Sequence, residues 1–449
     1  MRGVLLVFFL INNLLHAQVQ PCDKAISQLP GIEERAVKGE WETALSLCNT
    51  AMKSCPDRGE FLLLRADLFL KLDNIDSAEI DLRRYIFLFP NEGTGFRKMA
   101  GLHYFIGGID SSLHYLDRAL KINAADTIAL YNKGEVWFGE RELDKAEKQY
   151  LHLLKIAPDH LAARLRLCDI WISQDKTSAC REQLEIMQRN HAQNLDVILT
   201  DAMLLIREEH FDRAAVVLDN AQRIDSTEKA IYFTRALLYE RTNKYSEALR
   251  QYNKIITIDP DDANAYFERG NLLIEMDQFE LAIADYKDVL SIDTSFADAW
   301  HQIGIALYEL SDYEGSVKAM DEYLKRNPED AEAWFNRGNG KYAHQDYSDA
   351  LIDYNEALNR EENSDYRYNR AICHYALGNP SAAIRDLDEY LLKESADAEG
   401  YYLRCLCHLE IQQFEDGCSD CEMARKMGKK DIPKNINKIC NGKHRKKRK

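Results

Sequence analysis

The chain has 449 residues, of which 46% are hydrophobic and 29% charged, and its formal net charge is −16 at pH 7. This length is too great for one ordinary core and indicates several domains or a repeat array. The small numbers of glycine and proline, 21 and 9, exclude a collagen-like or disordered chain and favour a soluble, helix-rich protein.

The first 17 residues have the pattern of a secretory signal peptide. Arg2 precedes an apolar run that starts at Val4, and the small residue Ala17 stands at the expected cleavage site. The run is shorter than the roughly 20 residues that a bilayer requires, and no second run of that length follows. We therefore expect no integral membrane segment and an exported protein, in the periplasm or cell envelope of a bacterium or secreted. The eleven cysteines agree with an oxidising compartment.

From residue 25 onward the sequence repeats itself about every 34 residues. Small residues recur at positions 8 and 20 of the repeats, with Ile32 of the first repeat as the one departure, large residues recur at positions 4 and 24, and proline occurs at position 32 of five repeats. The twelve repeats begin at residues 25, 59, 93, 127, 161, 195, 229, 263, 297, 331, 364 and 398. Such a period is typical of helix hairpins that bury their apolar stripes only by stacking on neighbours.

This pattern resembles the tetratricopeptide repeat. The resemblance implies an all-α fold, a right-handed superhelical solenoid of antiparallel helix pairs with one concave wall. Residues 18–58 are then an N-terminal segment with a degenerate first repeat, residues 59–428 the repeat array, and residues 429–449 a basic C-terminal tail. Folding each hairpin about a turn near position 14 places position 4 opposite position 24 and position 8 opposite position 20.

Two cysteines of the fifth repeat, Cys168 and Cys180, occupy positions 8 and 20. Because we expect these positions to face each other where the helices come closest, we predict a disulfide between them. The alternative is two buried thiols selected for their small size. Two further disulfides are expected at the ends of the chain, Cys22 with Cys55 and Cys418 with Cys440. We assign no partner to the other five cysteines.

Arginine at position 7 and aspartate at position 23 occur together in five repeats. Such a pair can join the two helices of a hairpin, so we assign it a structural role, whose net contribution to stability depends on burial. The predicted ion pairs are Arg65–Asp81, Arg269–Asp285, Arg337–Asp353, Arg370–Asp386 and Arg404–Asp420.

Positions 2, 5, 6, 9, 12 and 13 of the first helix form a separate stripe. In the family that the chain resembles, this stripe lines the concave peptide-binding surface. From the eighth repeat onward it holds eight carboxylates and no Lys or Arg. The predicted groove residues are Phe267, Glu268, Asn271, Tyr308, Glu309, Glu332, Phe335, Asn336, Asn339, Tyr342, Tyr368, Asn369, Tyr375 and Tyr402.

Carboxylates and aromatic rings attract cations, and asparagine amides can pair with a peptide backbone. The expected partner is therefore a protein, bound through an extended or basic peptide segment, and not a nucleic acid. The alternative is that the aromatic residues pack between neighbouring repeats and the carboxylates form a solvated face. Position 5 lacks the lysine of the family's carboxylate clamp, which disfavours chaperone tails as ligands.

The end of the chain is strongly basic. Residues 426–449 hold eleven Lys or Arg and one Asp, whereas the rest of the chain has a net charge of −26. We expect the terminal segment GKHRKKRK to dock in the acidic groove of its own or a neighbouring molecule, which makes an oligomer possible. Attachment to anionic lipid or surface polysaccharide is the alternative.

The sequence contains no motif of a known catalytic, metal or cofactor site. The best catalytic candidate is the pair Cys418 and Cys421 in CSDC, but these cysteines lie inside a predicted helix and not at the start of one. We therefore predict a non-enzymatic protein-binding scaffold without metal or cofactor. The alternatives are a thiol-disulfide oxidoreductase using these two thiols and an envelope-attachment protein acting through its basic tail.

Overall fold

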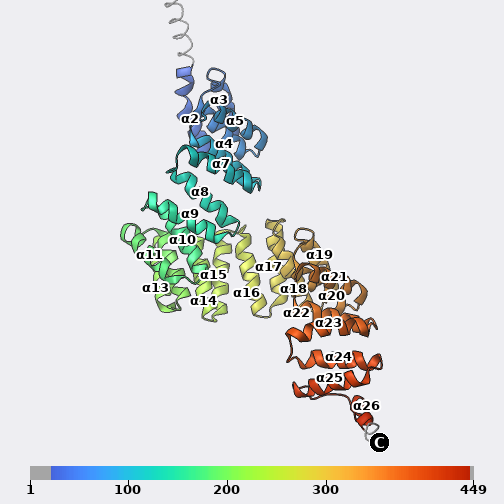
Figure 1. Ribbon diagram of the computed structural model, residues 1–449. Coiled ribbons are helices and arrows are strands. Elements are labelled where there is room, and N and C mark those ends of the chain that lie inside the picture. Colours follow the sequence, from blue (N-terminus) through green and yellow to red (C-terminus); the bar gives the residue numbers. More distant parts are fainter. Residues whose placement is uncertain (1–21, 445–449) are drawn as a thin grey trace, which may run out of the picture. The chain divides into compact units, whose positions relative to one another are not determined.

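The structure, a computed structural model, describes residues 22–444 (Figure 1). The predicted signal peptide, residues 1–17, lies outside the described residues, and GKHRKKRK lies outside those whose side chains are described. Every regular element of residues 22–444 is a helix, and successive helices pack in pairs, which confirms the predicted all-α fold. No helix in this range is long and apolar enough to cross a membrane.

Two compact units divide the chain, Met1–Val217 and Leu218–Lys449, and each contains helices stacked in chain order (Figure 1). The helices of the N-terminal unit are α2 Leu29–Val37, α3 Trp41–Met52, α4 Gly59–Lys71, α5 Ile75–Leu88, α6 Gly93–Phe105, α7 Ile109–Ile122, α8 Thr127–Gly139, α9 Leu143–Ile156, α10 Leu161–Ser173, α11 Thr177–His191 and α12 Leu195–Arg207. The boundary falls within α13 Phe211–Ile224.

The C-terminal unit continues the same pattern to the end of the array. Its helices are α14 Lys229–Arg241, α15 Tyr245–Ile258, α16 Ala263–Glu275, α17 Phe279–Ile292, α18 Ala297–Glu309, α19 Tyr313–Leu324, α20 Ala331–Ala343, α21 Tyr347–Arg360, α22 Ser364–Ala376, α23 Pro380–Lys393, α24 Ala398–Glu410, α25 Phe414–Lys426 and α26 Lys434–His444.

Local chemistry explains where these helices begin and end. Aspartate caps the first helix of several repeats; the carboxylate of Asp262, for example, accepts a hydrogen bond of 3.1 Å from the Ala265 N–H. Position 15 of all twelve repeats has a φ between 55° and 80°. Only Gly39, Gly107 and Gly378 are glycines there, so nine repeats hold a side chain in the left-handed region. This residue reverses the chain between the two helices of each hairpin.

The hairpin register differs from the predicted one, because position 8 faces position 24. A Cβ atom on Gly270 would lie 2.7 Å from the ring of Tyr286, and one on Gly338 would lie 2.8 Å from the ring of Tyr354. Position 20 lies instead against the backbone of position 8, since a Cβ on Gly417 would lie 3.2 Å from the Cys405 carbonyl oxygen. Both positions require small residues, but they do not face each other's side chains.

This register explains why the predicted Cys168–Cys180 disulfide is wrong. Both cysteines are fully buried free thiols, and the Cys168 thiol donates to the Cys180 carbonyl oxygen at 3.6 Å. The hydrogen bond with Cys180 and burial raise the pKa of Cys168 far above its usual range. The alternative interpretation, two small buried thiols, describes the structure.

Three other disulfides are present. Cys22–Cys55 and Cys418–Cys440, with Cα atoms 5.3 and 5.4 Å apart, confirm the two pairings predicted at the ends of the chain. The third, Cys405–Cys421, joins positions 8 and 24 of the last repeat and was not predicted. Its separation of 16 residues equals that of the Arg–Asp pairs, which is the sequence signal that could have identified it.

Candidate functional site

The predicted Arg–Asp pairs fix the helices that carry the stripe. All five are present, and in each pair two guanidinium nitrogens donate hydrogen bonds to the two carboxylate oxygens. In the eighth repeat Arg269 Nε and Nη2 lie 2.8 and 2.6 Å from the oxygens of Asp285, whose side chain is buried. Bidentate geometry at a buried carboxylate sets the register of the first helix on the second.

A second contact of the same arginines was not predicted. The Nη1 atom donates to an Asn or Asp at position 25 of the preceding repeat; Arg337 Nη1, for example, lies 2.6 Å from Asp321. The other partners are Asn49 for Arg65, Asn253 for Arg269, Asn355 for Arg370 and Asp388 for Arg404. Each arginine therefore joins three helices in two consecutive repeats.

The carboxylates of the stripe in repeats 8–12 are all exposed. We call this surface the acidic stripe, and its carboxylates are Glu268, Glu275, Asp298, Glu309, Glu332, Asp365, Glu399 and Glu410. Of these only Glu399 forms an ion pair with a residue of the described chain, and that partner is Lys429. The other seven carboxylates form no ion pair with any of residues 22–440, whose side chains the structure describes.

Aromatic rings of the stripe pack against neighbouring rings, as the alternative interpretation expects. Phe267 lies 4.9 Å from Phe296 and Phe335 lies 4.6 Å from Tyr366, measured between ring centroids. The other stripe contacts are Tyr308 with Tyr313, Tyr342 with Tyr347 and Tyr368 with Tyr390. Tyr308 nevertheless remains 36% exposed, and the predicted groove rings, Tyr375 and Tyr402 included, are not buried.

Tyrosines at position 24 orient two of the predicted asparagines. The hydroxyl groups of Tyr286 and Tyr354 donate to the side-chain oxygens of Asn271 and Asn339 at 2.9 and 3.0 Å. Each amide nitrogen remains a donor, and that of Asn271 reaches Glu268 at 3.2 Å. Two further predicted residues have local partners, since Asn336 contacts His301 and Asn369 donates to the Asp365 carbonyl.

One pocket of about 270 Å³ opens on the acidic stripe between α18, α19 and α20. It brings together five of the predicted groove residues, Tyr308, Glu309, Glu332, Asn336 and Asn339. Its other four lining residues, which are not among the predicted groove residues, are Gly304, Ile305, Ser316 and Met320. Burial, with smaller contributions from Tyr313 and Glu309, raises the pKa of Tyr308, so its hydroxyl stays protonated at neutral pH.

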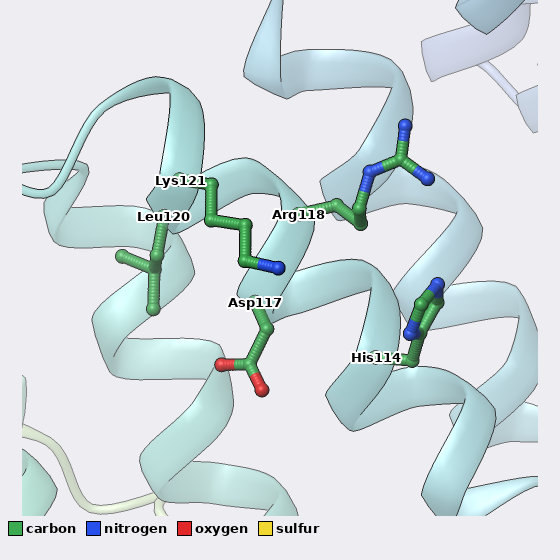
Figure 2. Close-up of a pocket in the computed structure, with 5 residues that line it drawn as sticks. All are labelled: His114, Asp117, Arg118, Leu120 and Lys121. Atoms are coloured by element: carbon green, nitrogen blue, oxygen red, sulfur yellow. The ribbon is translucent and has the colours of Figure 1, made fainter.

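A second hollow, of about 330 Å³, lies along α7 in the N-terminal unit (Figure 2). Its lining side chains come from one helix and do not converge on a common point (Figure 2). Asp117 pairs with Lys133 at 2.7 Å, and Arg118 lies over the ring of Phe96 at 4.8 Å. Two of its charged groups therefore already have partners, and with no convergent polar groups this hollow lacks the properties of a ligand site.

The start of the predicted basic tail contacts the stripe of the last repeat. Lys429 Nζ lies 2.5 Å from Glu399 and 4.9 Å from the centre of the Tyr402 ring. Its hydrogen bonds to Glu399 raise the pKa of Lys429. Helix α26 follows, and Ile432 and Ile436 are buried in the cluster that contains Cys405 and Cys421.

The cysteines of CSDC have different partners, because Cys418 bonds to Cys440 and Cys421 to Cys405. Thiol-disulfide exchange by a two-cysteine motif requires its own two sulfurs to share one bond. The observed pairing therefore gives no support to the oxidoreductase alternative. No group of three or more His, Cys, Asp or Glu in the described residues could hold a metal ion.

Known protein families and structures match the chain as follows. Two family models described as tetratricopeptide repeat match residues 98–160, 301–360 and 337–399, and residues 263–296; a third, described as TPR repeat, matches residues 241–277. No curated protein matches. Among solved structures, MamA 41-end from Desulfovibrio magneticus RS-1 is 15% identical with a TM-score of 0.36, over 38% of this chain and 96% of that one. The APC/C hetero-tetramer Cut9-Hcn1 is 13% identical with a TM-score of 0.37, over 91% and 94%.

Proposed function

This chain is a tetratricopeptide-repeat protein, and we propose that it is an exported, non-enzymatic scaffold that binds an extended basic segment of a protein partner along the acidic stripe. The observation that carries the proposal is the set of seven exposed carboxylates in repeats 8–12 that form no ion pair with the side chains the structure describes. Like charges on one surface repel one another, and a cationic partner removes that cost on binding.

The length and chemistry of the stripe support an extended ligand. Carboxylates recur in each of five consecutive repeats, so a segment lying along the stripe meets a negative charge at every step. Partly exposed rings supply faces for cations, and the amide of Asn339 can donate to a peptide carbonyl. Lys429 on Glu399 and Tyr402 is an internal example of a lysine held by these two residue types.

Three disulfides support the proposed export, because such bonds persist mainly in oxidising compartments. The signal-like sequence of residues 1–17 points in the same direction.

The test uses a peptide with the sequence of residues 441–449, NGKHRKKRK, and a control peptide in which its six Lys and Arg are replaced by Gln. Calorimetric titration of the full chain should give binding of the basic peptide alone, weakening as salt is raised. Converting the seven unpaired carboxylates to amides should abolish it while the helical circular dichroism persists. Equal binding of both peptides to the wild-type protein would overturn the proposal.

A further inference from the structure

Resting on the proposed function, we infer that the pocket between α18, α19 and α20 is the anchor of the acidic stripe and receives one lysine side chain of the partner. The remaining carboxylates then act on the ligand by charge alone.

The size of the pocket indicates a single side chain. Its volume of about 270 Å³ is below the roughly 300–1,000 Å³ of pockets that enclose whole small molecules. Ile305 and Met320 offer apolar surface to a methylene stem, and Glu309 and Glu332 supply two charges from different helices. Neither carboxylate has an ion-pair partner in the described part of the chain.

A second, independent feature is the hydroxyl group of Ser316. This residue lines the pocket, is 1% exposed, and its side chain makes no hydrogen bond with any described residue. The hydroxyl can therefore donate to or accept from a group that enters the pocket. Alanine fills position 20 in most other repeats, so the hydroxyl is not required for helix packing.

Lysine fits this arrangement better than arginine. Its ammonium group is a compact charge with three donors on a flexible stem, so it can pair with either glutamate without needing two parallel acceptors. The planar guanidinium group of arginine is best matched by a single carboxylate that accepts two parallel hydrogen bonds. The two carboxylates of this pocket belong instead to glutamates on different helices.

The experiment compares two double variants of the full-length chain that lose the same charge. E309Q with E332Q alters the pocket, whereas E275Q with E410Q alters two exposed stripe carboxylates outside it. Titrated with NGKHRKKRK, the pocket variant should bind at least tenfold more weakly than the wild type. The control variant should lose only about twofold, from its reduced charge.

Two further measurements separate the pocket from general attraction. S316A should weaken binding of NGKHRKKRK by about fivefold with unchanged thermal unfolding, and a peptide with every Lys replaced by Arg should bind the wild type at least fivefold more weakly. Equal losses in the two double variants, or equal binding of the Lys and Arg peptides, would refute the lysine anchor but leave the proposed function intact. Failure of the wild type to prefer the basic over the Gln peptide would refute both.

Discussion

The two compact units are built from the same helix hairpins but differ in whether the charges on the stripe are paired. In the N-terminal unit, an acid at position 9 pairs with a cation at position 6 of the next repeat: Asp67 with Lys98 at 2.6 Å, and Glu135 with Arg166 at 3.0 Å. In repeats 8–12 position 6 carries no cation, and the stripe carboxylates other than Glu399 have no ion pair among the described residues. The same fold therefore presents a self-neutralised surface in one unit and an acidic one in the other.

This difference shows how a repeat array can separate stability from recognition. Residues at positions 8, 20 and 24 pack hairpins in both units, and the Arg–Asp pair of positions 7 and 23 joins one hairpin of the N-terminal unit and four of the C-terminal unit. None of these positions belongs to the stripe, so the stripe positions are free to vary. A surface whose charges are already paired binds a charged ligand weakly, because the existing ion pairs would first have to break. We therefore propose that the C-terminal unit recognises the basic partner.

The largest expected effect tests the shared framework. D81A in the N-terminal unit and D353A in the C-terminal unit each leave an arginine without its buried carboxylate, and Asp353 also pairs with Lys341 at 2.7 Å. We expect each variant to lose about 3–5 kcal/mol of unfolding free energy, measured by urea denaturation. A loss in only one unit would show that the framework is not shared.

A repair variant should raise stability. Arg235 pairs with Asp219, but its buried Nε and Nη2 atoms have no hydrogen-bond partner among the described residues, because position 23 of its repeat is Gln251 and not Asp. Q251D should complete the bidentate pair and add about 1–2 kcal/mol of unfolding free energy. Q251N, which adds no charge, serves as the control, and equal effects of the two variants would contradict this interpretation.

Neutralising a stripe charge should change stability more in the N-terminal unit than in the C-terminal unit. R166Q breaks the pair with Glu135 and should cost about 1 kcal/mol of unfolding free energy. E309Q removes a charge that forms no ion pair with a described residue and should change the free energy of unfolding by less than about 0.5 kcal/mol. Thermal denaturation of both variants at low and high salt measures the difference, and a larger loss in E309Q would contradict the contrast between the units.

The smallest expected effect concerns His374 of the C-terminal unit. Burial lowers its pKa below the usual 6.5. The negative charge of Asp386 acts to raise this pKa, whereas the positive charges of Arg370 and Arg385 act to lower it. The folded state therefore resists protonation, so this contribution to stability is complete above pH 6.5 and is lost as the pH falls to the folded-state pKa. H374Q should flatten the stability profile below pH 6.5, and an unchanged slope would exclude His374 as its cause.

Much of the fold follows from the sequence alone. Stacked helix hairpins are indicated by the period of about 34 residues, by the small residues at positions 8 and 20, and by the Arg–Asp pairs. These features can be predicted because helical periodicity and the close approach of two helices both depend on the spacing of residue types along the chain. The same spacing places Phe267, Tyr308 and the stripe carboxylates on one face of their helices.

Tertiary structure decided which residues meet across the helices. Positions 8 and 24 face each other, so Cys405 bonds to Cys421 while Cys168 and Cys180 remain thiols. The angle at which helices cross likewise decides two further contacts. These are the hydrogen bond from Arg337 to Asp321 in the preceding repeat and the presence of Ser316 in the same pocket as Glu309. Crossing geometry results from the packing of whole side chains between helices, and spacing along one helix cannot specify it.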